Sequence, residues 1–234
     1  MGSNDIYMIE WAKPSDLSEI LSFLRENFDK EETVLNSIKN NNSLTEDDLN
    51  EMWNDHERLI KTIFEFSPCL LALDKSTKKI IGANLMIVSR NLKSNDRPGG
   101  VDEVFNDNPP VTKLMKQYFD CFSEIEEKAE LHLNFPNANA AVEFYAVAVD
   151  RNYRKMGIAT GLMKEGVTFA RNTFQDSGFV FGICTSIFSK KAIQKVGLES
   201  VFEVDLLEYK DDSGRPIYQD TAPHNTVSLM ALEL

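Results

Sequence analysis

Cysteine is scarce in this chain of 234 residues, which contains only Cys69, Cys121 and Cys184. The three cysteines lie far apart, are odd in number and form no Cys-x-x-Cys pair or Cys/His cluster. Such a pattern supports neither a disulfide framework nor a zinc site. We therefore expect a reduced protein of the cytoplasm that holds no metal.

Long apolar runs are also lacking, because no stretch reaches the roughly 18 residues that span a bilayer. The first residues, Met1–Ile6, form no hydrophobic segment of the signal-peptide type. Position 6 carries Ile6 rather than Ser or Thr, so the N-myristoylation pattern is incomplete. We expect no membrane partner, and we expect the glycosylation triplet Asn41-Asn42-Ser43 to remain unused.

The chain has fewer basic than acidic residues. It contains 25 Lys and Arg residues and 37 Asp and Glu residues, which give a net charge of -12. Such a surface repels the phosphates of nucleic acids and of anionic lipids, so we expect no nucleic-acid partner. It weakly favours cationic small molecules, although many enzymes are acidic for solubility alone.

We expect the chain to act as a monomer.

No internal repeat, low-complexity tract or linker divides the chain, and 42% of its residues are hydrophobic. One α/β (α+β) domain over residues 1–234 is the simplest arrangement. Apolar alternation predicts strands at 6–11, 69–73, 79–88, 141–149, 179–184, 200–208 and 226–232. Helical spacing predicts helices at 14–24, 45–63, 114–125, 157–172 and 190–196. The polar stretch 91–110 contains Pro98-Gly99-Gly100 and Pro109-Pro110, which predict a long loop.

The most informative segment runs from Val147 to Met163 and predicts a strand, a tight basic turn and a helix. The helix begins among small residues, which let an anion approach the free N–H groups of its first turn. The helix dipole adds partial positive charge there, and Arg154 and Lys155 add side-chain charge. Such a turn suits a pyrophosphate.

Two other phosphate-binding motifs fit this segment less well. The Gly-x-Gly-x-x-Gly spacing of dinucleotide-binding proteins is absent, and no βαβ unit with a correctly spaced acidic residue follows. A Walker A loop is absent too. The remaining alternative is an ordinary strand–turn–helix connection with two basic residues that binds no phosphate.

The run Arg154-x-x-Gly157-x-Ala159 resembles the Gln/Arg-x-x-Gly-x-Gly/Ala signature of the GNAT acetyltransferases. The resemblance implies a GNAT fold, in which a mixed, mostly antiparallel twisted sheet is flanked by helices and a splayed strand pair binds acetyl-CoA. It implies that the strand backbone pairs with the pantetheine arm and polarises the thioester carbonyl. The implied acetyl-CoA contacts are Val147, Ala148, Val149, Arg154, Lys155, Met156, Gly157, Ile158, Ala159 and Thr160.

Residues 27–36 resemble the Phe-x-x-Asp-Glu-Pro-Leu-Asn segment of the insect arylalkylamine N-acetyltransferases, a branch of the same superfamily. The glutamate of that segment is taken to be the general base, acting through water, and it corresponds here to Glu32. Thr33 replaces the usual proline and the register can shift by one residue, so Glu31 is the second candidate. On the residues alone, a solvated acidic pair at a helix start is the favoured interpretation of Glu31-Glu32, and only the resemblance indicates a base.

Two further stretches resemble the same branch. Residues 222–230 are similar to its Pro-His-Thr-Ser-x-x-Leu-Met ending, with Asn225 as an extra residue after His224. Residues 184–189 contain the hydroxyl residues that, by resemblance, relay protons near the thiolate. The best match is Ser189, followed by Thr185 and Ser186. On the sequence alone, capping of the helix that follows is the favoured role of these three residues, and it is compatible with a second role in catalysis.

The resemblance implies an enzyme that transfers acetyl from acetyl-CoA to the primary amine of a small aromatic substrate such as dopamine, serotonin, tyramine, octopamine or tryptamine. Phe28, Trp53 and Tyr145 are candidates for the aromatic wall of the amine pocket, whereas His56 is expected to be a core or boundary histidine. Two alternatives stay open: a GNAT enzyme for other small amines such as polyamines or histamine, and a CoA-binding GNAT protein without catalysis.

Overall fold

The computed structural model describes residues 6–41, 44–92, 108–211 and 213–234. The loop predicted at 91–110 falls mostly outside these ranges, as do Asn42 and Ser43 of the glycosylation triplet. Within the described residues, no helix is long and apolar enough to cross a membrane.

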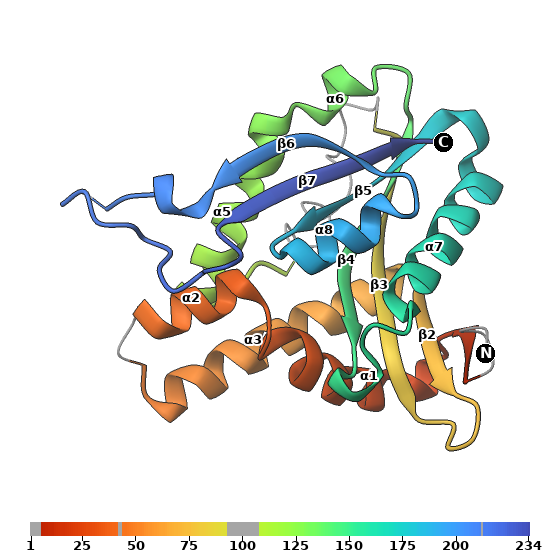
Figure 1. Cartoon of the computed structure of the whole chain (residues 1–234), viewed down its shortest axis with the longest axis horizontal. Coiled ribbons are helices and arrows are strands. Elements are labelled where there is room, and N and C mark those ends of the chain that lie inside the picture. Colours follow the sequence, from red (N-terminus) through yellow and green to blue (C-terminus); the bar gives the residue numbers. More distant parts are fainter. Residues whose placement is uncertain (1–5, 42–43, 93–107, 212) are drawn as a thin grey trace.

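Seven strands of the described chain form one mixed sheet in the order β1-β2-β3-β4-β5-β7-β6 (Figure 1). Their bounds are β1 Tyr7–Trp11, β2 Cys69–Asp74, β3 Ile80–Arg90, β4 Ala140–Val149, β5 Gly178–Cys184, β6 Glu199–Asp205 and β7 Thr226–Glu233. All neighbouring pairs are antiparallel except β4 and β5, which are parallel. The predicted GNAT-type sheet is confirmed.

The parallel pair is short. Ala140–Glu143 of β4 lie opposite Gly178–Phe181 of β5, and beyond these residues the two strands no longer pair. β4 continues to Val149 along β3, while β5 continues to Cys184 along β7. The edges of β4 and β5 therefore separate in the middle of the sheet, as the resemblance implied.

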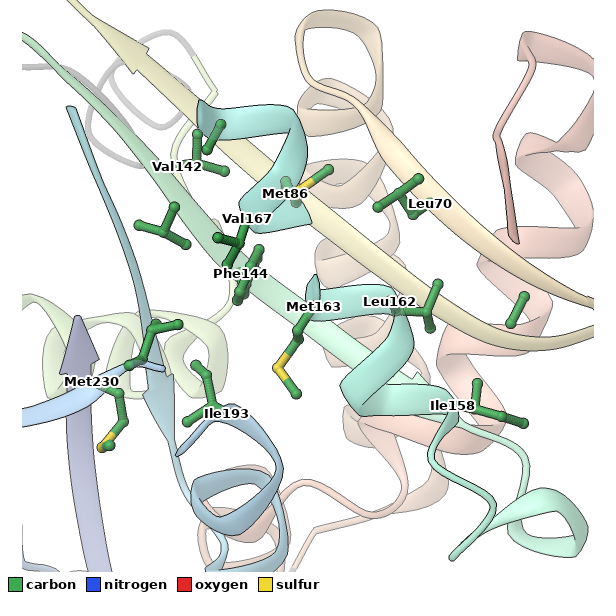
Figure 2. Close-up of a cluster of buried hydrophobic side chains, with 14 of the residues drawn as sticks. Leu70, Met86, Val142, Phe144, Ile158, Leu162, Met163, Val167, Ile193 and Met230 are labelled. Atoms are coloured by element: carbon green, nitrogen blue, oxygen red, sulfur yellow. The ribbon is translucent and has the colours of Figure 1, made fainter. Parts of the chain in front are cut away.

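Helices α7 (Ile158–Phe174) and α8 (Ile187–Gln194) cover one face of the sheet (Figure 1). Apolar residues of α7 at helical spacing pack on β3 and β4, and Figure 2 shows Met163 and Val167 beside Phe144. Burial of such a cluster is the main stabilising term in a fold of this size. This packing fixes the start of α7 relative to the end of β4.

The opposite face is covered by α1 (Leu17–Leu24), α2 (Thr33–Asn41), α3 (Glu46–Phe66) and α5 (Lys113–Ala129). Thr45 and Asp48 form the capping box expected at the start of α3, in which the Thr45 hydroxyl accepts from Asp48 N–H at 3.2 Å. Short helical segments fill the connections, namely η2 Pro14–Asp16, η3 Arg25–Asp29, α6 Leu131–Asn134, η4 Arg151–Tyr153, η5 Gln175–Ser177 and η6 Leu206–Glu208.

The structure differs from the sequence-based expectation at three places. The helix predicted at 14–24 runs on through the π-helical turn η3, and α2 follows at the helix start that was considered for Glu31-Glu32 but given no bounds. The helix predicted at 190–196 begins three residues earlier, because Ser186 caps it at Ile187. The strand predicted at 200–208 ends at Asp205, whose carboxylate accepts from Leu207 N–H at 2.9 Å and starts the turn η6.

Candidate active site

A cavity of about 1020 Å³ opens where β4 and β5 separate. It reaches the start of α7 and α8 on one face and η3, α2 and α5 on the other. The cavity thus passes through the sheet and connects two differently charged ends. One end carries Arg154, Lys155, Lys191 and Lys195, and the other carries Glu126, Glu127 and Glu143.

The basic end is built around the first turn of α7. Gly157 is the N-cap of this helix, has a φ of 80°, and makes no side-chain capping bond. A Cβ added to Gly157 would meet nothing within 4 Å, so the space in front of the helix start is open. This geometry fits the pyrophosphate of acetyl-CoA, because first-turn N–H groups and the helix dipole attract an anion that a side chain would keep at a distance.

Nine of the ten residues implied to contact acetyl-CoA line the cavity, namely Val147, Ala148, Val149, Arg154, Lys155, Gly157, Ile158, Ala159 and Thr160. Met156 does not line it, and its side chain is 40% exposed on the surface. Ile158 is buried in the apolar cluster under α7, so only its backbone is available to a ligand.

The edge of β4 supplies the second part of this end. Val147, Ala148 and Val149 line the cavity beyond the point where β5 stops pairing with β4. Backbone groups on an unpaired strand edge are free to bond an extended ligand, as a pantetheine arm would require.

Glu31 forms ion pairs with two arginines near this end. Arg151 Nη2 lies 2.6 Å from Glu31 Oε1, and Arg154 Nη1 lies 3.3 Å from Glu31 Oε2. Arg154 also donates from Nε to the Val149 carbonyl at 3.3 Å. Both carboxylate oxygens of Glu31 are thus occupied by guanidinium groups.

Glu32 has the opposite environment, with a residue exposure of only 6%. Its Oε2 accepts from Leu35 N–H at 2.6 Å and thereby caps α2. Its Oε1 is buried and makes no hydrogen bond with the protein. Burial raises the pKa of Glu32, and the nearby Thr185 hydroxyl and backbone N–H groups oppose this only in part. A buried carboxylate with a raised pKa beside a cavity suits a general base.

The three predicted hydroxyl residues lie together at the start of α8 and all line the cavity. Ser186 is the N-cap, and its hydroxyl accepts from Ser189 N–H at 3.0 Å. The Ser189 hydroxyl lies 2.9 Å from that of Ser186 and donates to the Ser186 carbonyl at 2.9 Å. The capping arrangement considered from sequence is therefore present, on the wall of the cavity.

His224 also contributes to this wall. Its Nδ1 accepts from Ile187 N–H at 3.3 Å, and its ring meets Phe188 edge-on at a centroid distance of 5.3 Å. His224 thus satisfies one of the first N–H groups of α8 and ties the β6–β7 connection to that helix.

Aromatic side chains line the end of the cavity that faces away from α7. Of the three candidates, Phe28 and Tyr145 line it, whereas Trp53 is 8% exposed and packs in the core between α2, α3 and α5. Tyr118 and Phe122 of α5 complete the wall. Their positions on α5 were predicted only as part of an amphipathic helix, since the pattern cannot distinguish core from cavity.

A buried hydrogen-bonded chain that sequence did not indicate lies behind this wall. His56 of α3 is completely buried, as expected for a core histidine. Its Nδ1 lies 2.8 Å from Asp29 Oδ1, and its Nε2 lies 2.9 Å from the Tyr145 hydroxyl. Asp29 belongs to η3 and Tyr145 to β4, so only the folded arrangement brings the three residues together.

Cys184 lies at the end of β5 on the cavity wall. Burial raises the pKa of its thiol to about 12, with the Ser189 side chain opposing the rise. A thiol with such a pKa stays protonated at neutral pH, and only the thiolate is a good nucleophile. The cavity therefore favours direct transfer between two bound substrates over an acetyl-cysteine intermediate.

The acetyltransferase (GNAT) family model matches residues 104–184, which include β4, the basic turn, α7 and β5. The chain has the GNAT acetyltransferase fold. The matched segment and the fold support an acetyl-transferring enzyme, and acetyl-CoA is the co-substrate of the GNAT family.

Solved GNAT structures resemble the chain over nearly its whole length. Mosquito arylalkylamine N-acetyltransferase-like 5b is 20% identical with a TM-score of 0.73, and the match covers 97% of this chain and 100% of that one. The putative arylalkylamine N-acetyltransferase 7 of Aedes aegypti is 18% identical with a TM-score of 0.77, covering 97% and 87%. Drosophila melanogaster polyamine N-acetyltransferase, which forms N-acetylagmatine, is 16% identical with a TM-score of 0.69, covering 97% and 100%.

Proposed function

We propose that this GNAT protein transfers the acetyl group of acetyl-CoA to the primary amine of a small aromatic amine, such as dopamine, serotonin, tyramine, octopamine or tryptamine. The observation that carries the proposal is Glu32, whose buried carboxylate has one oxygen without a partner in an aromatic-lined cavity. The likeness to arylalkylamine N-acetyltransferases supports the same substrate class.

Acetyl-CoA binds at the basic end of the cavity. The first-turn N–H groups of α7 receive the pyrophosphate, and Arg154 and Lys155 add positive charge beside it. The pantetheine arm extends along the free edge of β4 at Val147–Val149. Backbone N–H groups on that edge polarise the thioester carbonyl and stabilise the oxyanion that forms during transfer.

The amine arrives as an ammonium ion, because a primary amine has a pKa near 10. Its nitrogen has no lone pair until a proton leaves. Glu32 takes that proton, directly or through water, and its raised pKa brings it nearer to neutral pH, where a general base works best. The ring of the substrate packs against Phe28, Tyr118 and Phe122.

The free amine then attacks the thioester carbon, the C–N bond forms and the C–S bond breaks. The departing thiolate takes a proton from the hydroxyl pair Ser186 and Ser189, which lies at the start of α8 on the cavity wall. Because both substrates occupy one cavity, their proximity supplies much of the acceleration.

A second candidate substrate is a primary amine that carries another positive charge, such as agmatine, spermidine or histamine. The observation in its favour is the acidic end of the cavity, where Glu143 is 7% exposed and Glu126 and Glu127 of α5 also line the wall. These three carboxylates would attract a second positive charge on the substrate. The likeness to the polyamine N-acetyltransferase supports this alternative.

We further propose that residues 1–234 act as one domain in the cytoplasm. All seven strands of the described residues belong to one sheet, which supports a single unit. Cys69, Cys121 and Cys184 are free and buried, as is typical of proteins in a reducing compartment.

The test is the rate of CoA thiol release from acetyl-CoA with a panel of amines: dopamine, serotonin, tyramine, phenethylamine, histamine, agmatine and spermidine. We expect the highest kcat/KM with the aromatic monoamines. A higher kcat/KM with agmatine or spermidine would replace the first substrate class with the second. Absence of turnover with every amine, despite binding of acetyl-CoA, would reject the proposed function.

A further inference from the structure

Asp29, His56 and Tyr145 form one continuous hydrogen-bonded chain that ends at the cavity. Asp29 is 3% exposed and His56 is fully buried, whereas Tyr145 lines the cavity. The distances of 2.8 Å from Asp29 Oδ1 to His56 Nδ1 and 2.9 Å from His56 Nε2 to the Tyr145 hydroxyl are those of good hydrogen bonds.

The chemistry of the three groups gives this chain a direction. An ionised Asp29 only accepts, so His56 donates to it from Nδ1. A neutral imidazole that donates from Nδ1 must accept at Nε2, and the Tyr145 hydroxyl therefore donates to His56. The lone pairs of the Tyr145 oxygen are then left for a donor in the cavity.

The cavity around Tyr145 is also where the acceptor amine has to lie. Glu32, Tyr118 and Glu143 line the same cavity, and the charges on Glu143, Asp29 and Glu32 act on Tyr145. Burial, the first cause, and these acidic neighbours raise the pKa of Tyr145 well above its usual value. Tyr145 therefore stays a neutral phenol, which accepts a hydrogen bond from an amine and can accept its proton only by giving its own to His56.

We propose that Tyr145 is a second catalytic residue of this site, which orients the attacking nitrogen and takes up the proton it loses as the amide forms, with His56 and Asp29 as positioning residues behind it. The inference rests on the proposed function, since it concerns the acceptor amine of that same cavity. It adds a proton route that neither the family match nor the sequence motifs indicated.

The proton balance is complete within these groups. Glu32 removes the first proton, from the ammonium ion, before attack. As the C–N bond forms, an N–H proton passes to the Tyr145 oxygen while the Tyr145 hydroxyl proton passes to His56 Nε2. This leaves an imidazolium beside the Asp29 carboxylate, which stabilises it. When the amide leaves, the proton returns from His56 through Tyr145 to the cavity, where it replaces the proton that the Ser186–Ser189 pair gave to the CoA thiolate. Glu32 releases its proton to solvent, so one proton is set free in each turnover.

The experiment measures kcat and both KM values for Tyr145→Phe and His56→Gln with the fastest amine of the panel. Phe keeps the ring and removes the hydroxyl. Gln can still accept a hydrogen bond from Tyr145 but cannot take its proton. We expect kcat to fall about 10²-fold in each variant, within the range for one acid–base group, with KM for acetyl-CoA changed less than about threefold.

The double variant Tyr145→Phe/His56→Gln identifies how His56 acts. If His56 works through Tyr145, the double variant has the kcat of Tyr145→Phe alone, because the effects of coupled residues do not add. The matched control is Tyr218→Phe, which also removes a buried tyrosine hydroxyl, at a residue that is 4% exposed in the core and does not line the cavity. We expect its kcat to equal that of wild type.

Two results would overturn the proposal. A Tyr145→Phe variant that keeps the wild-type kcat would remove Tyr145 from the reaction, and a His56→Gln variant that keeps it would show that His56 takes up no proton from Tyr145. The thermal unfolding temperature of each variant, compared with that of Tyr218→Phe, shows whether a lowered kcat comes from misfolding. If the wild-type protein acetylates no amine of the panel, the proposed function fails first and the catalytic role of Tyr145 fails with it.

Discussion

The two carboxylate oxygens of Glu32 have different roles, since Oε2 caps α2 and Oε1 is buried near the Thr185 hydroxyl beside the cavity. The first role stabilises the fold and the second leaves a basic group on the cavity wall. A substitution at Glu32 therefore has to keep the cap if it is to report on catalysis. Glutamine does so, because its side-chain oxygen can still accept from Leu35 N–H.

We predict that Glu32→Gln lowers kcat about 10²- to 10⁴-fold and changes the Kd for acetyl-CoA little. Wild-type kcat should fall with decreasing pH, and at a higher pH than an ordinary glutamate would impose, because the base must be ionised and burial raises its pKa. Steady-state rates between pH 5 and 9, with calorimetric binding of acetyl-CoA, check both statements. An unchanged kcat in Glu32→Gln would remove Glu32 from the role of base.

The same raised pKa predicts the effect of Glu32 on stability. The folded state binds this proton more tightly than the unfolded chain, so the contribution of Glu32 is most favourable below its usual pKa and declines as pH rises through the raised value. Glu32→Gln should consequently lose no thermal stability at pH 7. Calorimetric unfolding would contradict this if the variant melted well below the wild-type protein at that pH.

Cys184 permits a further prediction at this scale. Its thiol, with a pKa of about 12, should carry no acetyl group after the protein is incubated with acetyl-CoA alone. Intact-mass spectrometry of the incubated protein checks this directly. A stable acetyl adduct on Cys184 that an added amine discharges would mean a covalent intermediate and would replace the direct-transfer mechanism.

The start of α7 is the element on which acetyl-CoA binding depends. Gly157→Ala places a methyl group in open space at a φ of 80°, which costs about 1–2 kcal/mol in any L-residue other than Gly. The methyl group also occupies the approach to the first-turn N–H groups. We predict lower stability together with at least a tenfold higher KM for acetyl-CoA, measured by initial rates.

Gly214 offers a control matched in backbone geometry. It also has a φ of 80° and no atom within 4 Å of an added Cβ, but it lies between β6 and β7 and does not line the cavity. Gly214→Ala should therefore cost similar stability and leave KM for acetyl-CoA unchanged. Equal effects of both variants on KM would mean that the first turn of α7 does not bind the coenzyme.

For single helices, strands and turns, the sequence was informative where the pattern lies within one continuous segment. The small residues after Arg154 predict an anion-binding helix start, and the periodic patterns predict all seven strands and the capped start of α3. The patterns did not predict η3, because a π-helical turn has no distinctive spacing, and the helix start considered at Glu31-Glu32 was not extended into α2. The sequence preferred Glu32 to Glu31 by resemblance alone, and the fold adds that Glu32 is buried whereas Glu31 is paired with arginines.

The chain of Asp29, His56 and Tyr145 shows the limit of sequence more clearly. His56 and Tyr145 are 89 positions apart, and an isolated histidine on an apolar helix stripe looks the same whether it is satisfied in the core or coupled to a cavity. Only the packing of α3 and η3 against β4 distinguishes the two. The signal that the sequence does contain is a polar residue on the apolar stripe of a predicted helix, with no obvious partner in the sequence.

For the whole molecule, the main feature is a cavity with opposite charge at its two ends inside a protein of net charge -12. The basic end fits the phosphates of acetyl-CoA and the acidic end fits an ammonium ion, so both substrates should be bound when transfer occurs. We predict intersecting double-reciprocal plots when both concentrations are varied. Parallel lines would indicate that CoA leaves before the amine binds.

The central claim is that acetyl passes from acetyl-CoA to the nitrogen of a small primary amine in the cavity between β4 and β5. The most direct measurement uses acetyl-CoA with an isotope-labelled acetyl group and follows both the label and free CoA thiol, with tyramine as acceptor. The account predicts one labelled N-acetyl amide for each thiol released, at a rate far above that of Glu32→Gln. Thiol release without labelled amide, or labelled amide formed equally fast by wild type and Glu32→Gln, would contradict it.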